Sequence, residues 1–319
     1  MATFAYSSAG LYTVGVEDQQ RVADYPRVAV TGALVLLFVS LLLLVVFFAH
    51  HLAHSIQIDE VMARVQESTL NVVRGLPING VSTAPVPVRP NWAVPIPEER
   101  SGYVQAVHLE ALIATATTHD ALATVARMIG EHVIAGSPLV WVWKTTAEHP
   151  RPRAVDWLTA VHDSVRIGFE RTLEQDAAFG VRQLADIAAK ALSPAINDPY
   201  TAAQALDHLS VVLSALAVRP LGNEHLVDGA GRLRVVVPGR DFGYFVDLAC
   251  GQIRRFGKAE PRVVNALLRN LRDVGGFCAD DNRRSVVRQV ELVLADAEAA
   301  VAQNPVTSLR SASKPAPFC

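Results

Sequence analysis

The charged residues best suited to chemistry gather in one stretch, residues 171–209, whose sequence is RTLEQDAAFGVRQLADIAAKALSPAINDPYTAAQALDHL. On a helix, Arg182 and Asp186 would be neighbours four residues apart, and Asp186 and Lys190 would form a second such pair. The same helix is rich in apolar residues, and a buried Arg or Asp is costly unless it is paired and hydrogen-bonded. We therefore predict an internal ion-pair network that fixes how helices dock. A polar pocket for a ligand or ion, and catalysis, are the two alternatives.

The same stretch contains a turn, residues 193–199, between two predicted helices. Asp198 stands before a proline, which is typical of a residue that caps a helix N-terminus. Capping explains neither Asn197 nor Asp207 on the next helix, and these residues could line a cation or polar-ligand site. The candidate ligand-binding residues are therefore Arg171, Asp176, Arg182, Asp186, Asn197, Asp198 and Asp207. No catalytic residue, metal site or cofactor is predicted.

The sequence contains no signature of a common enzyme family. Cys250, Cys278 and Cys319 stand far apart without a CxxC pair, so neither a zinc site nor a disulfide framework is indicated. His50 and His54 have the spacing of a helical metal pair but no HExxH pattern, and an interfacial role is expected for them. Phosphate loops, dinucleotide fingerprints and nucleophile elbows are missing. With a formal net charge of −2, the chain has no basic excess that would indicate a nucleic-acid partner.

An apolar run at residues 28–49, VAVTGALVLLFVSLLLLVVFFA, is the strongest structural signal in the sequence. As a helix it would be about 33 Å long at ~1.5 Å per residue, close to the ~30 Å of a bilayer core. We therefore predict a transmembrane helix at 28–49, with the lipid bilayer as partner. Residues 1–27 are expected to be an interfacial helix or the remnant of an earlier span. Isolated thiols favour a cytoplasmic body, whereas Arg21 and Arg27 favour a cytoplasmic N-terminus, so the topology is left open.

The rest of the chain divides into five regions by composition and periodicity. They are a membrane-proximal helix (50–74), a proline-rich linker (75–100), a small β domain (101–150), a helical domain (151–304) and a disordered tail (305–319). The membrane-proximal helix is expected to pack on its own body or on further copies of itself. The turn at 129–138 resembles that of biotinyl and lipoyl domains, but the opposing turn at 114–120 has no lysine to carry a prosthetic group. The predicted fold class is mainly α with a small β subdomain: a transmembrane helix, a small barrel-sandwich-like β domain and an α-helical bundle.

Individual elements can be assigned within these regions. Predicted strands lie at 102–107, 121–128 and 138–143, with a hairpin at 227–237. Predicted helices lie at 156–167, 174–192, 199–216, 242–256, 261–273 and 281–302.

The long motif at 171–209 also carries a family resemblance. Its matching residues are Arg171, Gln175-Asp176, Phe179-Gly180, Arg182-Gln183-Leu184, Asp186-Ile187-Ala188, Ala191-Leu-Ser-Pro194, Asn197-Asp198-Pro199 and Thr201-Ala202. Further matches are Gly102-Tyr-Val-Gln105 and Tyr25-Pro26-Arg27. The chain thus resembles the bacterial predicted-membrane-protein family known as domain of unknown function 2254. The resemblance implies an integral membrane protein without an established activity, usually with further transmembrane helices before the one at 28–49.

Three functions are consistent with these features. The first is a membrane-anchored, oligomeric scaffold or regulatory module whose body lies in the cytoplasm, at the bacterial inner membrane. The second is a subunit of a channel or transporter, in which additional spans form the pore. The third is an enzyme that uses an Asp/Arg-lined pocket between residues 176 and 207.

Overall fold

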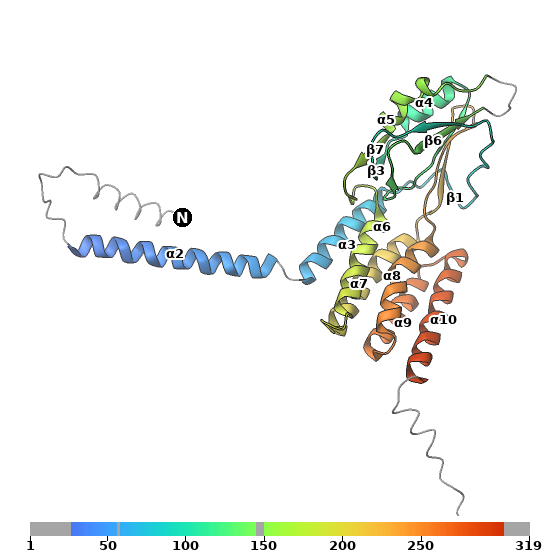
Figure 1. Cartoon of the computed structure of the whole chain (residues 1–319). Helices are drawn as coiled ribbons and strands as arrows, with labels where there is room; N and C mark the ends of the chain where they lie inside the picture. Colours follow the sequence, from blue (N-terminus) through green and yellow to red (C-terminus); the bar gives the residue numbers. More distant parts are fainter. Residues whose placement is uncertain (1–26, 56–57, 145–149, 303–319) are drawn as a thin grey trace, which may run out of the picture. The chain divides into compact units, whose positions relative to one another are not determined.

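The computed structural model describes residues 27–55, 58–144 and 150–302. The chain divides into two compact units, Met1–Val61 and Met62–Cys319. The larger unit contains a helical lobe of side-by-side helices and a β lobe at one end of them (Figure 1). The predicted N-terminal segment 1–27 and the tail 305–319 lie outside the described residues, apart from Arg27.

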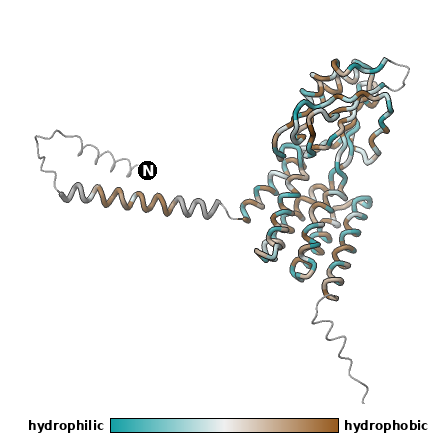
Figure 2. Tube along the Cα trace, in the orientation of Figure 1, coloured by the Kyte–Doolittle hydropathy of each residue, from teal (hydrophilic) through white to brown (hydrophobic). Residues whose placement is uncertain are grey.

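The first unit contains α2 (Arg27–Ser55) and the beginning of α3 (Ile58–Gly75). Hydrophobic residues follow one another along the middle of α2 (Figure 2), and the largest of them, such as Phe38 and Phe47, are exposed. Within the part of the chain that the structure describes, however, no helix has both the length and the apolar character that a membrane crossing requires. The apolar run therefore forms a helix, as predicted, but the transmembrane helix expected at 28–49 is not supported.

The helical lobe consists of six helices around one apolar core. They are α3, α6 (Ala177–Ala191), α7 (Pro199–Ala217), α8 (Phe242–Gly257), α9 (Pro261–Gly275) and α10 (Asp280–Ala302). The helices predicted from periodicity and capping signals are confirmed here, with ends shifted by at most a few residues. The predicted cap at Asp198 is also confirmed, because its carboxylate accepts hydrogen bonds from the backbone N–H groups of Tyr200 and Thr201, each at 3.1 Å.

The helix α3, which covers most of the region predicted as a membrane-proximal helix at 50–74, packs on its own body, as one of the two sequence interpretations expects. Met62 and Val73 are buried in the core of the helical lobe. His208 on α7 lies 2.7 Å from the Gln66 side chain. Gly180 on α6 meets Thr69, and a Cβ at position 180 would lie 2.8 Å from the Thr69 Cβ. Glycine is needed at 180 because the two helices approach so closely there.

The β lobe contains two sheets. The six-stranded sheet has the order β1-β8-β9-β4-β6-β2 and the three-stranded sheet the order β5-β3-β7. Its strands are β1 (Val81–Ser82), β2 (Val94–Pro97), β3 (Gly102–Val107), β4 (Leu122–Val125), β5 (His132–Val133), β6 (Pro138–Trp143), β7 (Val165–Gly168), β8 (Asn223–Val227) and β9 (Leu233–Val237). The helices α4 (Glu110–Thr118) and α5 (Leu158–Ser164) and the short 3-10 turn η1 (Ala154–Asp156) complete the lobe. Trp157, fully buried, lies in its apolar core.

The predicted fold class is wrong: the body is mixed α/β, and its sheets form no closed barrel in the described part of the chain. The hairpin β8–β9 does not stand apart from the β domain, because β9 pairs in parallel with β4. The proline-rich linker contributes β1 and β2, and prolines are tolerated in β2 because it is an edge strand. Residues 110–118, expected to include a turn, form α4. The helix predicted at 156–167 gives way to β7, where Val165 and Ile167 favour a strand.

A network of charges attaches the β8–β9 hairpin to the turn before β4. The buried Arg234 guanidinium donates to Asp228 at 2.8 Å and to Asp120 at 2.6 Å. Asp228 also accepts hydrogen bonds from the backbone N–H groups of Ala230 and Arg232. Those backbone hydrogen bonds and the arginines hold the pKa of Asp228 well below its ordinary value. This carboxylate is therefore ionised and fixes the hairpin at neutral pH.

Candidate functional site

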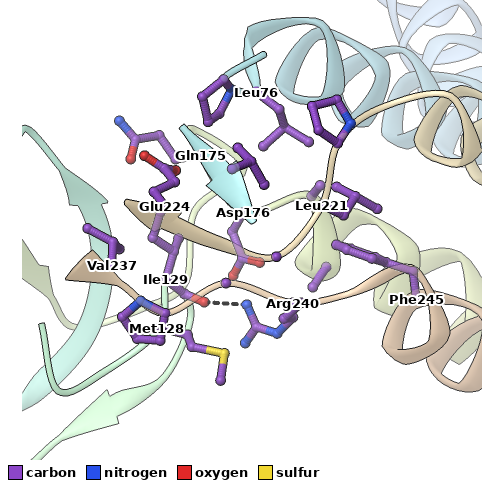
Figure 3. Close-up of a pocket in the computed structure, with 18 residues that line it drawn as sticks. Leu76, Met128, Ile129, Gln175, Asp176, Leu221, Glu224, Val237, Arg240 and Phe245 are labelled. Atoms are coloured by element: carbon purple, nitrogen blue, oxygen red, sulfur yellow. Dashed lines mark hydrogen bonds between the residues drawn. The ribbon is translucent and has the colours of Figure 1, made fainter. Parts of the chain in front are cut away.

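A cleft lies between the helical lobe and the β lobe. It consists of two adjoining cavities of about 90 and 550 Å³ that share Leu76, Pro77, Ile129, Gln175 and Glu224 in their walls. The larger cavity lies within the range of ~300–1,000 Å³ that is typical of small-molecule sites. Both lobes contribute to the walls of each cavity, and Figure 3 shows the residues that line the smaller one.

Glu224 is the distinctive residue of this cleft. It lies in β8 between β1 and β9, opposite Val81 and Val237, and its side chain is partly buried beside Gln175 (Figure 3). Among the described residues its carboxylate has neither a salt bridge nor a hydrogen bond. Burial raises the pKa of Glu224 above its ordinary value, because a carboxylate that loses water without gaining a partner is disfavoured.

The wall formed by α6 is held by a buried ion pair. Asp176 accepts hydrogen bonds from Arg171 Nε at 3.0 Å and Nη2 at 2.7 Å. Its second oxygen caps α6 by accepting from the Phe179 N–H. The side chain of Gln175 accepts from the Val107 N–H at 3.0 Å and so links the segment before α6 to β3. The walls of the cleft are thus fixed by directed hydrogen bonds from both lobes.

Gly130 packs directly on this ion pair. It has φ +83°, and a Cβ there would overlap Asp176 Oδ2 and lie 2.8 Å from Arg171 Nη2. Both the left-handed conformation and the lack of space require glycine. Next to it, the Ile129 carbonyl accepts a hydrogen bond of 2.7 Å from Arg240 (Figure 3). Arg240 in turn lies 5.0 Å from the ring centre of Tyr244.

The structure does not bring the seven predicted site residues together. Arg171 and Asp176 form the buried pair, and Asp176 lines the smaller cavity. Arg182 and Asp186 form a pair with a distance of 3.4 Å, but it is exposed on α6 and fixes no helix contact. The internal network predicted for Arg182, Asp186 and Lys190 is therefore wrong: among the described residues only the Arg182–Asp186 pair forms, and it is exposed.

The remaining predicted residues lie elsewhere on the helical lobe. Asn197 has φ +49°, the left-handed region that asparagine tolerates, and its N–H donates to Ser193 at 2.9 Å. Turn geometry thus accounts for Asn197, which capping alone did not. Asp198 caps α7, and Asp207 pairs with Arg269 of α9 at 2.6 Å.

Sequence reasoning does not identify the cleft residues Glu224 and Arg240, nor Gly130, which packs on the ion pair beside the cleft. The sequence predicts the hairpin only from Val227 onward, which leaves its first strand, and with it Glu224, unassigned. A Gly between two predicted strands was a usable signal for Gly130, but its contact with Asp176 depends on tertiary structure.

The described residues contain neither a candidate metal site nor a reactive thiol. They contain no group of three or more His, Cys, Asp or Glu side chains placed to hold a metal ion. Cys250 is fully buried, and burial raises the pKa of its thiol to about 12. Burial also raises the pKa of Cys278. Both thiols are therefore protonated at neutral pH and poorly suited to nucleophilic attack.

The mixed α/β body with an interlobe cleft can now be compared with known proteins. A family model described as "Predicted membrane protein (DUF2254)" matches residues 1–273. The chain belongs to this family, which confirms the resemblance in the sequence and supports a membrane localisation.

Proteins of Mycobacterium tuberculosis and Mycobacterium bovis, each named "uncharacterized protein", are 43% identical to the chain over 303 residues. The match covers 93% of this chain but 57% of each relative, so the chain spans little more than half their length. No solved structure matches the chain significantly.

Proposed function

We propose that this chain is the ligand-sensing regulatory region of a bacterial membrane protein, and that its ligand is a small organic cation. The observation that carries the proposal is the partly buried carboxylate of Glu224, which faces the interlobe cleft without a partner among the described residues. A protein keeps such a group at a cost in stability. A ligand that supplies the missing positive charge offsets this cost.

The lining of the larger cavity favours a cation with an apolar part. Its polar side chains are Ser68, Asn71, Glu174, Gln175 and Glu224, and the described lining contains no Lys, Arg or His. The other carboxylate, Glu174, is already paired with Arg166, so Glu224 is the carboxylate of this cavity that has no partner among the described residues. Leucine, isoleucine, valine and proline side chains form the rest of the wall and would receive an alkyl group.

The position of the cleft supports a regulatory role. The larger cavity is lined by α3 and by the segment before α6 on one side, and by β3 and β8 on the other. A ligand that prefers one arrangement of these elements shifts the protein toward it. The helix α3 lines the cleft with Ser68 and Asn71, and we propose that a shift of α3 is how a bound ligand acts on the rest of the chain.

Calorimetry on the full chain in detergent tests this proposal with hexylammonium as probe. We expect hexylammonium to bind, and uncharged hexanol and anionic hexanoate to bind at least tenfold more weakly. Glu224→Gln should weaken hexylammonium binding at least tenfold, because the amide keeps the shape but removes the charge. Glu174→Gln is the matched control, since it alters a paired carboxylate of the same cavity, and it should change the affinity less than threefold.

Two results would overturn the proposal. One is equal binding of hexanol and hexylammonium, which would show that the cleft recognises only apolar surface. The other is equal loss of affinity in Glu224→Gln and Glu174→Gln, which would show that Glu224 has no special part. The oligomeric scaffold, the channel or transporter subunit, the enzyme and the cytoplasmic position of the body stay predictions, and no contact in the described residues favours them over ligand sensing.

A further inference from the structure

A second polar groove lies on the helical lobe, between the first halves of α7 and α9. It has a volume of about 500 Å³, and its polar lining residues are Tyr200, Gln204, Asp207, Arg262, Asn265 and Arg269. Arg262 lies over the ring of Tyr200 at 5.8 Å, and Arg269 contacts Asp207 seven residues further along both helices. Because the contacts advance together, α7 and α9 run in the same direction and begin at the same end of the groove.

Hydrogen-bond donors dominate this groove. Among the described residues, the Arg262 guanidinium has no carboxylate partner, and the Gln204 and Asn265 side chains have no hydrogen bond. Arg269 uses one nitrogen, Nη2, to contact Asp207 at 2.6 Å, which leaves its other N–H groups unused. An anion in the groove would therefore meet several free donors from both helices.

The backbone does not supply these donors, because both helix N-termini are already capped. Asp198 accepts from the Tyr200 and Thr201 N–H groups, and Glu260 accepts from the Arg262 N–H. The parallel macrodipoles still favour negative charge at this end. The carboxylates Asp198, Glu260 and Asp207 oppose it, so an anion must be bound by the arginine side chains themselves.

We propose that this groove binds a phosphate-bearing ligand through Arg262 and Arg269. The planar guanidinium fork suits the bidentate recognition of phosphate oxygens. The two arginines are separated by two helical turns, about 10 Å along the axis. Two extended arginine side chains can close this distance onto one phosphate, and a diphosphate can span it. The bound phosphate group would belong either to a soluble phosphate compound or to the headgroup of an anionic lipid.

Binding measurements on the full chain in detergent distinguish the two sources. Pyrophosphate is titrated in one arm, and short-chain phosphatidylglycerol is compared with short-chain phosphatidylcholine in the other. Binding of pyrophosphate alone assigns the groove to a soluble ligand, and selective binding of phosphatidylglycerol assigns it to a lipid headgroup. Either result supports the proposal if it depends on the groove arginines.

Variants of arginines on α9 test whether binding of the phosphate probe depends on Arg262 and Arg269. Arg262→Gln and Arg269→Gln should each weaken binding of the phosphate probe at least tenfold, and Arg262→Lys should recover part of the loss. Arg272→Gln is the control, because the Arg272 side chain is exposed on the same helix and, among the described residues, is hydrogen-bonded to its neighbour Asp273 alone. It should change binding less than twofold. Absence of binding in both arms, or an equal effect of Arg262→Gln and Arg272→Gln, would overturn the proposal. Neither result would affect the cation proposal, since the interlobe cleft shares no lining residue with this groove.

Discussion

Replacing Gly130 with alanine tests whether the buried ion pair holds the wall of the cleft. The new Cβ would overlap Asp176 Oδ2 and approach both Nε and Nη2 of Arg171 to less than 3 Å. Alanine in the left-handed region costs about 1–2 kcal/mol. Displacing Asp176 adds the loss of a helix cap, about 0.5–2 kcal/mol, and of a hydrogen bond between charged groups, about 1.5–3 kcal/mol. Together these terms predict that Gly130→Ala lowers the free energy of unfolding by about 3–7 kcal/mol.

Gly136→Ala is a matched control for this substitution. Gly136 also has φ +83°, but a Cβ there would meet nothing within 4 Å. It should cost only the conformational part, about 1–2 kcal/mol. Denaturant unfolding of the full chain can be followed by tryptophan fluorescence, because all four tryptophans, Trp92, Trp141, Trp143 and Trp157, lie between residues 92 and 157. If both variants lose the same stability within about 0.5 kcal/mol, contact with the ion pair has no structural weight and the reasoning is refuted.

Three further predictions concern the rest of the body. Burial raises the pKa of Glu224 in the folded state above its unfolded value, so the ionised carboxylate destabilises the fold above the folded pKa, and this penalty is absent below the unfolded pKa. Glu224→Gln should therefore raise the melting temperature at pH 7 and not at pH 4. A gain that does not depend on pH would argue against this reasoning. Gly180→Ala should cost about 1–3 kcal/mol in denaturant unfolding by overpacking against Thr69, and an unchanged midpoint would show that α3 can move away freely. Arg234→Met should lower the melting temperature more than Arg232→Met, because the Arg234 side chain is 5% exposed and that of Arg232 is 59% exposed. Equal losses would show that the buried ion pair of Arg234 with Asp228 contributes no more to stability than the exposed arginine does.

The helices of the body could be predicted from the sequence because their signals are local. Asp198 before Pro199 and Glu260 before Pro261 mark where α7 and α9 begin, and apolar spacing marks the buried faces. The sheet could not be predicted in the same way. The parallel pairing of Ala123 with Val235 joins segments more than a hundred residues apart, and no local pattern specifies such a partner.

The candidate site was predicted only in part, for the same reason. Arg171 and Asp176 are both predicted site residues, and the structure pairs them although no helical spacing predicts the contact. Arg182 and Asp186 also meet, but helical spacing does not reveal which side of α6 faces the solvent. Glu224 is a single acidic residue in a polar strand, and only the folded structure shows that it lies opposite α6 without a partner among the described residues.

The state of the Glu224 carboxyl is the most direct test of a cation site in the cleft. It can be followed by NMR of the full chain labelled with ¹³C at glutamate carboxyl carbons, with the signal assigned by its loss in Glu224→Gln. We predict that the pKa of Glu224 lies above that of an ordinary glutamate in the free protein and falls when hexylammonium is added, because the bound cation stabilises the carboxylate. A pKa that is ordinary in the free protein, or that does not change at saturating hexylammonium, would contradict the proposed function.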